Sequence, residues 1–348
     1  MTRPHVLYYA QDPGGTRYLD PVIATLWNEQ TFDWSVMLHP FAKKSALMDD
    51  KYVSNRIAFS DQVPARQSYF ESVIDDLNPD AIVCTTSAQA RDASNGALIA
   101  AAKARDIPCL ASMDHWKGLD RFFEGDAPQY YPDQLICIDE ATKTALHDAG
   151  LDTSGVHAIG HPGLEHLECD RPPISASPWR ILLVSQPIVE AGAYHGIYDE
   201  PLDGHRLIDS IAYALSSDIK NGGVEVYLRR HPKEHVGNAL PIGIQIDDIA
   251  DWNQARAHYD VFVGFDTMAL IEASFSGAPC VRLALPELAD ISDRPVPLDT
   301  GVLTTNLKDL SKNIREAVSR STTPAPNPFS GSTARAADTI RNFVNSIL

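Results

Sequence analysis

The residues best suited to chemistry lie between Leu228 and Glu234, where the sequence reads Leu-Arg-Arg-His-Pro-Lys-Glu. The apolar run that starts at Val224 precedes them and predicts a buried strand. His231 therefore stands at the carboxyl end of a strand, where open parallel sheets bind their ligands. Two arginines, including Arg230, a histidine and a lysine at one strand end suit an anionic ligand. The alternative interpretation is a turn with solvated basic side chains.

This basic cluster stands out because the chain as a whole is acidic. Its 348 residues carry a net charge of −17. A negative surface field disfavours nucleic acids and anionic membranes, so we expect no nucleic-acid binding and at most peripheral membrane association. No apolar run reaches the roughly 18 residues that a membrane span needs. Five widely spaced cysteines without a Cys-x-x-Cys pair fit a reducing compartment. We expect a soluble, cytoplasmic protein.

A second group of candidate residues follows the first apolar strand, residues 6–10. Asp12 precedes a Pro-Gly-Gly sequence, in which Gly14 and Gly15 would let backbone approach a ligand closely at the start of a helix. Asp12 is then either a general base that deprotonates an acceptor hydroxyl or an ordinary helix cap. The loop matches neither the G-x-G-x-x-G nor the Walker A pattern, so it indicates neither a dinucleotide nor an ATPase site.

Asp114, His115 and Trp116 form a third group, after the predicted strand 108–113. We take Asp114 as the reserve candidate for the base because it also ends a strand. His115 and the apolar face of Trp116 would contact a sugar acceptor. A structural tryptophan in a loop is the competing interpretation.

Two further strand ends in the second half of the chain carry polar residues. Asp266 and Thr267 precede a helix that starts at Met268, and either is a natural N-cap. The same helix start presents backbone N–H groups to a phosphate. From inside this helix Glu272 would reach a ribose diol.

Ser185 and Gln186 end the predicted strand 181–185, in the position that corresponds to Asp12 in the first half. The loop that follows, up to Gly204, is too long for a plain connector and is typical of a binding loop. We therefore count both residues among the candidates for nucleotide binding.

These candidates depend on two series of alternating strands and helices, which predict α/β domains with parallel sheets. A proline-rich break between Gly160 and Pro178 separates the two series. We predict an N-terminal domain over 1–165, a C-terminal domain over 175–330 and a final helix that crosses back to the first domain within 331–348. The predicted strands are 6–10, 34–38, 81–85, 108–113, 135–138, 156–159, 181–185, 224–228, 245–246, 261–264 and 280–283. The predicted helices include 88–105, 140–149, 206–216, 250–258, 268–276, 307–319 and 334–347.

Several catalytic signatures are absent from the sequence. It contains no Asp-x-Asp, no G-x-S-x-G and no H-E-x-x-H pattern. We therefore expect neither a metal site nor a cofactor.

In this layout the chain resembles the GT-B sugar-nucleotide enzymes, which have two facing Rossmann-like domains with a cleft between them. His231-Pro232 resembles the His-Pro motif of bacterial sialyltransferases and related capsule transferases. Asp266-Thr267 with Glu272 resembles the GT-B segment that binds phosphate and ribose. The resemblance implies a metal-independent glycosyltransferase that moves a sugar from a nucleotide donor, a CMP-sugar favoured, to a glycan or polysaccharide acceptor. His231, Arg230 and Thr267 would stabilise the departing phosphate, and Asp12 would be the base.

Two alternatives remain open. Gly15-Thr16-Arg17 followed by Pro21 resembles the opening segment of the non-hydrolysing UDP-GlcNAc 2-epimerases, a branch of the same architecture. We rank this interpretation below the transferase. The other alternative is a non-catalytic protein of the same fold that binds a nucleotide sugar or a glycan.

Overall fold

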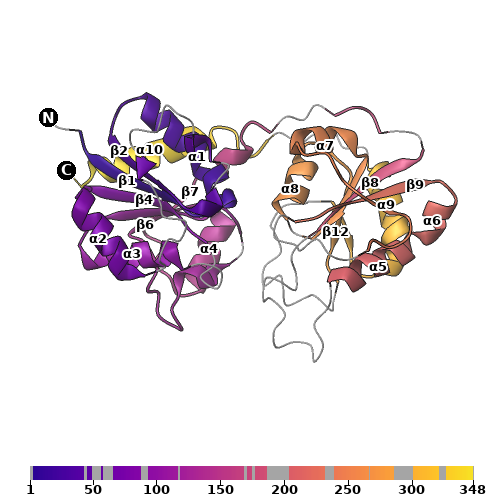
Figure 1. Ribbon diagram of the computed structural model, residues 1–348, viewed down its shortest axis with the longest axis horizontal. Helices are drawn as coiled ribbons and strands as arrows, with labels where there is room; N and C mark the ends of the chain where they lie inside the picture. The colour runs from indigo at the N-terminus through magenta and orange to yellow at the C-terminus, as the bar shows by residue number, and fades with distance from the viewer. Residues whose placement is uncertain are drawn as a thin grey trace. The chain divides into compact units, whose positions relative to one another are not determined.

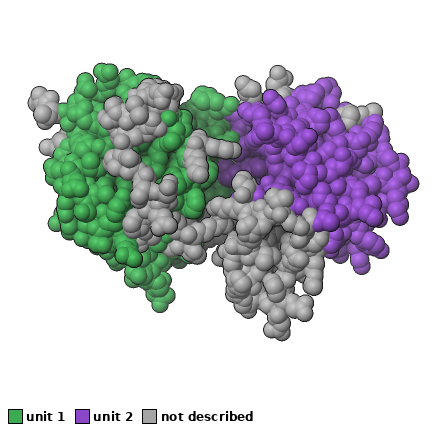
Figure 2. Space-filling model, viewed as in Figure 1, with its two compact units in different colours: residues 1–166, 328–348 green, residues 167–327 purple. Residues whose placement is uncertain are grey.

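The computed structural model describes residues 3–42, 45–48, 56–57, 66–87, 93–116, 118–167, 171–174, 177–185, 204–231, 239–265, 267–285, 301–320 and 327–347. The chain forms two compact units, shown in different colours in Figure 2. Residues 1–166 and 328–348 make unit 1, and residues 167–327 make unit 2.

Unit 1 contains a parallel sheet whose strands follow the order β3-β2-β1-β4-β5-β6-β7. The chain direction across the sheet reverses between β1 and β4, which makes their carboxyl ends the switch point where α/β sheets bind ligands. The strands are β1 (His5–Ala10), β2 (Asp33–Leu38), β3 (Arg56–Ile57), β4 (Ala81–Thr85), β5 (Cys109–Ser112), β6 (Gln134–Cys137) and β7 (Val156–Ala158).

Helices cover both faces of this sheet (Figure 1). Leu7 and Tyr9 of β1 share a buried core with Phe70 and Leu98, because alternate residues of a strand face the same side. The helices and short 3-10 turns are α1 (Pro13–Asn28), η1 (Pro40–Ala42), η2 (Ala46–Met48), α2 (Gln67–Leu77), α3 (Ser94–Ala104), η4 (Leu119–Phe122), α4 (Glu140–Asp148), η5 (Pro162–Leu164) and α10 (Ser332–Asn345).

The C-terminal helix α10 belongs to unit 1 and lies beside α1 (Figure 1). Glu165 caps it: Oε1 accepts a 2.6 Å hydrogen bond from the N–H of Gly331, and Oε2 accepts a 2.8 Å bond from the N–H of Thr333. A carboxylate at this position is favourable because the first N–H groups of a helix have no partner inside it. Toward the C-terminal end of α10, Arg341 forms an ion pair with Glu29, the residue that follows α1.

Unit 2 repeats the arrangement with the strand order β10-β9-β8-β11-β12-β13. Ile181 and Leu183 of β8 pack into one core with α5 and α9, whereas Leu182 and Val184 pack into another with α7 and α8. The elements are β8 (Trp179–Val184), α5 (Gly204–Ala214), α6 (Ser216–Lys220), β9 (Val224–Arg229), β10 (Ile244–Ile246), α7 (Trp252–His258), β11 (Val261–Gly264), α8 (Met268–Phe275), β12 (Cys280–Leu283), β13 (Val302–Thr304), η7 (Leu307–Asp309) and α9 (Leu310–Ser319).

The predicted α/β class with two Rossmann-like sheets is confirmed, and in both sheets the paired strands are parallel. Among the described strands and α-helices, β3, α2, α6 and β13 were not predicted. The predicted helix 206–216 corresponds to α5, which ends at Ala214, and the short helix α6 begins at Ser216. None of the helices described is long and apolar enough to cross a membrane.

Candidate functional site

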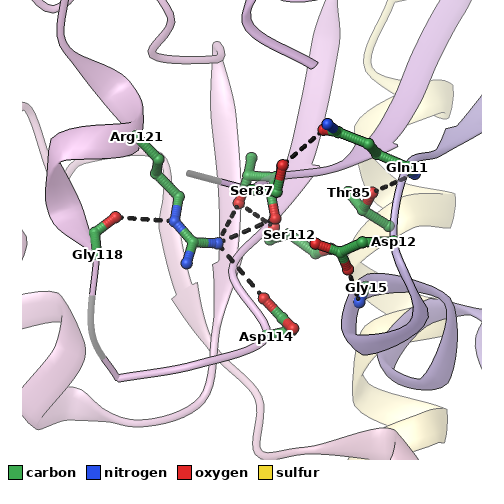
Figure 3. A network of polar contacts seen from close by, with 10 residues as sticks. Gln11, Asp12, Gly15, Thr85, Ser87, Ser112, Asp114, Gly118 and Arg121 are labelled. Atoms are coloured by element: carbon green, nitrogen blue, oxygen red, sulfur yellow. Dashed lines mark hydrogen bonds and ion pairs between the residues drawn. The ribbon is translucent and has the colours of Figure 1, made fainter. Parts of the chain in front are cut away.

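Polar side chains gather at the carboxyl ends of β1, β4 and β5 in unit 1 (Figure 3). These strands are neighbours and run in parallel, so their ends meet at the switch point of the sheet. The residues that follow the three strands are Gln11 and Asp12 after β1, Thr86 and Ser87 after β4, and Met113 and Asp114 after β5.

Asp12 is the N-cap of α1. Its backbone is extended, and its Oδ1 accepts a 2.8 Å hydrogen bond from the N–H of Gly15. Asp12 therefore has the helix-cap role that was one of its two interpretations from the sequence. The side chain is half-buried at the start of the helix, and its role as a base stays a prediction.

Gly14 allows the carboxylates of Asp12 and Asp114 to approach each other. A Cβ atom at Gly14 would lie 2.4 Å from Oδ2 of Asp114 and 3.5 Å from Oδ1 of Asp12. Both carboxylate oxygens therefore lie close to the same point beside Gly14. Because the first distance is far inside van der Waals contact, any side chain at Gly14 would displace the Asp114 carboxylate. The site thus holds two carboxylates beside one glycine.

Gly15 is required for a different reason, which is the packing of α1 against β4. A Cβ atom there would lie 2.6 Å from Cβ of Thr85. The same Thr85 accepts a 3.2 Å hydrogen bond from the N–H of Gln11, and Oγ of Ser87 donates a 2.6 Å bond to Oε1 of Gln11. These contacts place the first turn of α1 against the end of β4.

Arg121 contacts the other carboxylate oxygen of Asp114, Oδ1. It lies in η4, is 7 % exposed, and its Nη1 is 3.4 Å from Oδ1 of Asp114. The guanidinium also donates to the carbonyl oxygens of Gly118 and Thr86. The sequence indicates no role for Arg121, because nothing in the spacing of the residues shows that this arginine is buried.

Trp116 does not form an open surface for a sugar. Its side chain is 3 % exposed, and its indole N–H donates a 2.7 Å hydrogen bond to Oδ2 of Asp139, the N-cap of α4. The structure thus corrects the predicted acceptor contact in favour of the structural tryptophan. His115 is half-buried beside it, with the two ring centroids 5.9 Å apart.

In unit 2 the predicted nucleotide-binding residues also lie at the carboxyl ends of neighbouring strands. Ser185 follows β8, and its N–H donates a 3.0 Å hydrogen bond to the carbonyl oxygen of Arg229 at the end of β9. Arg230 and His231 come next, and both are partly buried. Lys233, Gln186 and Asp266 lie outside the described residues.

Thr267 follows the adjacent strand β11 and caps α8. Its Oγ1 accepts a 3.1 Å hydrogen bond from the N–H of Leu270. The capping interpretation is therefore confirmed for Thr267. Phosphate binding at this helix start is compatible with the cap, because a side-chain cap satisfies only one of the first N–H groups.

The side chain of Arg229, unlike its carbonyl group, is engaged away from this edge. Its Nε is 2.7 Å from Oδ2 of the buried Asp247, and its guanidinium lies over the ring of Trp252, 5.0 Å from the centroid. The sequence suggested that all the basic residues of the cluster serve an anionic ligand. For Arg229 this is wrong, since its charge is paired inside the unit.

Glu272 is also engaged inside unit 2. It is 1 % exposed, and its Oε2 accepts a 2.7 Å hydrogen bond from the indole N–H of Trp252. This contact joins α8 to α7. In this arrangement the carboxylate does not face solvent, so a ribose could reach it only if the Trp252 contact opened.

No family model matches the chain, and no curated protein sequence is similar to it. Solved structures are similar over the whole length. The UDP-GlcNAc 2-epimerase of Methanocaldococcus jannaschii, in complex with UDP-GlcNAc and UDP, has a TM-score of 0.62 at 14 % identity, with 97 % of this chain and 99 % of that chain covered. The UDP-GlcNAc 2-epimerase of Neisseria meningitidis bound to UDP-GlcNAc has the same TM-score and identity, with coverages of 97 % and 100 %.

A third similar structure is the glycotransferase of kitacinnamycin, with a TM-score of 0.60, 13 % identity and coverages of 99 % and 100 %. At this level of identity the likeness concerns the fold. Together with the two doubly wound sheets, it shows that the chain has the GT-B fold.

Proposed function

We propose that this chain is a nucleotide-sugar enzyme that acts on a UDP-N-acetylhexosamine and inverts the sugar at C2. The proposal reverses the ranking made from the sequence, which placed a CMP-sugar transferase first. Support for the change comes from the similar structures, several of which are UDP-GlcNAc 2-epimerases matched over nearly the whole of both chains.

The observation that carries the proposal is the pair of carboxylates around Gly14. Inversion at C2 can proceed if a base removes the C2 proton from one face while the C1–O bond to UDP breaks, so that the electron pair forms a C1–C2 double bond. The reverse addition returns UDP to C1 and a proton to the other face of C2. Such a reaction needs a base and an acid, and two carboxylates in different surroundings can divide these roles. Asp12 and Asp114 are the candidates, since they follow β1 and β5, the two strands on either side of β4 at the switch point of unit 1.

For the nucleotide we propose the carboxyl edge of the sheet in unit 2. Arg230 and His231 would supply donors and positive charge to the phosphates, and the start of α8 behind Thr267 would add backbone N–H groups. Ser185 lies at the end of the central strand of this edge. Compared with the set expected from the sequence, this set omits Glu272, which is buried, and also Gln186 and Asp266, which lie outside the described residues.

A glycosyltransferase is the second candidate function. The glycotransferase of kitacinnamycin has the same fold over its full length, and transfer to a hydroxyl acceptor would need only one carboxylate as base. In that case Asp12 would activate the acceptor, as the sequence suggested. A CMP-sugar as donor remains part of this second candidate only.

Incubation with UDP-GlcNAc in D₂O distinguishes the two. An epimerase places deuterium at C2 and produces the 2-epimer, both visible by ¹H NMR, whereas a transferase without acceptor does neither. Asp12→Asn and Asp114→Asn should each lower the rate by at least about 10²-fold while the Kd for UDP stays within about twofold.

Asp12→Asn is the suitable variant because asparagine caps a helix as well as aspartate does, whereas alanine would cost about 1 kcal/mol of stability. UDP binding without any exchange at C2 or any transfer would favour the non-catalytic interpretation. Absence of UDP binding together with absence of exchange would overturn the proposal.

A further inference from the structure

Arg121 is a buried cation beside the switch point of unit 1 (Figure 3). Burial of an arginine is unfavourable unless its donors are satisfied. Its Nε donates a 2.8 Å hydrogen bond to the carbonyl oxygen of Gly118. Its Nη1 is 3.0 Å from the carbonyl oxygen of Thr86 and 3.1 Å from Oγ1 of the same residue.

These contacts anchor the guanidinium on the main chain at two places. Gly118 belongs to the loop after β5, and Thr86 follows β4. Thr86 is itself held at the end of β5, because its N–H and its Oγ1 both donate to the carbonyl oxygen of Ser112, at 3.1 Å and 2.7 Å. The position of the charge is therefore set by backbone and does not depend on Asp114.

Asp114 is the acceptor that this anchored group faces. Its Oδ1 is 3.4 Å from Nη1 of Arg121, whereas its Oδ2 occupies the space that a side chain at Gly14 would fill. Arg121 thus contacts one oxygen of the carboxylate, and the absence of a side chain at Gly14 leaves room for the other. The contact with Arg121 is longer than those with the main chain, so it constrains the carboxylate without closing it off from other partners.

We propose that Arg121 is a positioning residue that holds the Asp114 carboxylate in the geometry required for proton transfer beside Gly14. The proposal rests on the function proposed above. Arginine suits this role because its planar fork donates to several acceptors in fixed directions, which an ammonium group cannot do. A misplacement of a reacting group by about 1 Å can lower a rate on the order of 10²-fold.

The first test compares kcat with KM, using UDP-GlcNAc as substrate. Arg121→Lys keeps the charge and loses the fork, so kcat should fall at least about tenfold while KM stays within about twofold. Arg335→Lys is the matched control. Arg335 is anchored in the same way, on the carbonyl oxygens of Ile159 and Ser330 and on Oγ of Ser332, and this variant should keep the wild-type kcat.

Gly14→Ala tests the same geometry from the opposite side, with Arg121 intact. Its Cβ would displace Oδ2 of Asp114, so kcat should again fall at least about tenfold. Wild-type kcat in Arg121→Lys, or an equal loss of kcat in Arg335→Lys, would overturn the proposal.

The second test does not require turnover. It is a double-mutant cycle on urea unfolding with Arg121→Lys, Asp114→Asn and the double variant. Coupled residues give non-additive effects, which we expect to reach at least about threefold in the unfolding constant. Additive effects would overturn the proposal. If the wild type neither epimerises nor transfers, the proposed function fails, whereas a non-additive cycle still supports the contact between Arg121 and Asp114.

Discussion

The indole N–H of Trp252 donates a 2.7 Å hydrogen bond to Oε2 of Glu272, and this contact joins two helices on one face of the sheet in unit 2. Trp252 opens α7, whereas Glu272 lies inside α8. The same indole also contacts Arg229, whose guanidinium lies over the ring. A carboxylate that the sequence places near a nucleotide is thereby used to hold the unit together.

Trp252→Phe should lower the free energy of unfolding by about 1.5–3 kcal/mol. The phenyl ring keeps an aromatic face beside Arg229 but removes the indole hydrogen bond to the buried Glu272 oxygen, and hydrogen bonds to charged groups have this magnitude. Urea denaturation measures the loss. Tyr227→Phe is the control, because it removes only a part-buried 3.1 Å bond to Glu225. Equal losses in the two variants would contradict the special role of the Trp252 contact.

His231→Ala should weaken UDP binding at least about tenfold, which corresponds to about 1.4 kcal/mol. The reason is its place directly after β9, at the edge where Ser185 and Thr267 also lie. Titration calorimetry with UDP gives the Kd, and circular dichroism checks the fold. His147→Ala, on an exposed side chain of α4 in unit 1, is the control. Unchanged affinity in His231→Ala would remove this edge as the nucleotide site.

Asp20 should make stability depend on pH. Burial raises the pKa of this carboxyl from 3.8 to about 6, against the opposing effect of hydrogen bonds from Ser45, Ala46 and Tyr8. Between about pH 4 and pH 6 the folded protein thus keeps a proton that the unfolded chain has released. Stability from this group is present below pH 4 and is lost as the pH rises through 6.

The loss amounts to at most about 3 kcal/mol, since one pKa unit corresponds to about 1.4 kcal/mol. Asp20→Asn removes the titration and can still accept from the N–H of Ala46. Urea denaturation from pH 4 to pH 7 measures the unfolding free energies of wild type and Asp20→Asn. As the pH rises, the wild type should lose stability relative to the variant. A constant difference across this range would show that the carboxyl titrates alike in both states.

The sequence was sufficient for the strands that are continuous apolar runs. Such runs are buried on both faces of a parallel sheet, so their position needs no knowledge of the partners. The strand Val261–Gly264 was predicted with its observed limits. The strand Cys280–Leu283 was also predicted with its observed limits, although Arg282 interrupts its apolar run. β13 is different: it has three residues, with Leu303 partly exposed, and is defined by its pairing with β12. Short edge strands of this kind depend on a neighbour far away in the sequence.

Candidate residues at strand ends could likewise be found from the sequence, because the carboxyl edge of a parallel sheet is where polar residues follow apolar runs. Asp12, Asp114, His231 and Thr267 were located in this way. Which of their neighbours face solvent could not be found. Trp116 and Glu272 are buried through contacts with Asp139 and Trp252, 23 and 20 residues away. Burial and side-chain direction are decided by packing between distant elements.

The sequence by itself thus determined two α/β domains and the strand ends where chemistry is expected. Only the tertiary structure decided that the carboxylates of Asp12 and Asp114 both lie beside Gly14, and that Arg121 is anchored on Thr86, 35 residues away. The physical reason is that a pattern of apolar and polar residues fixes which side of an element is buried. Distances between side chains arise only when the sheet brings separate strand ends together.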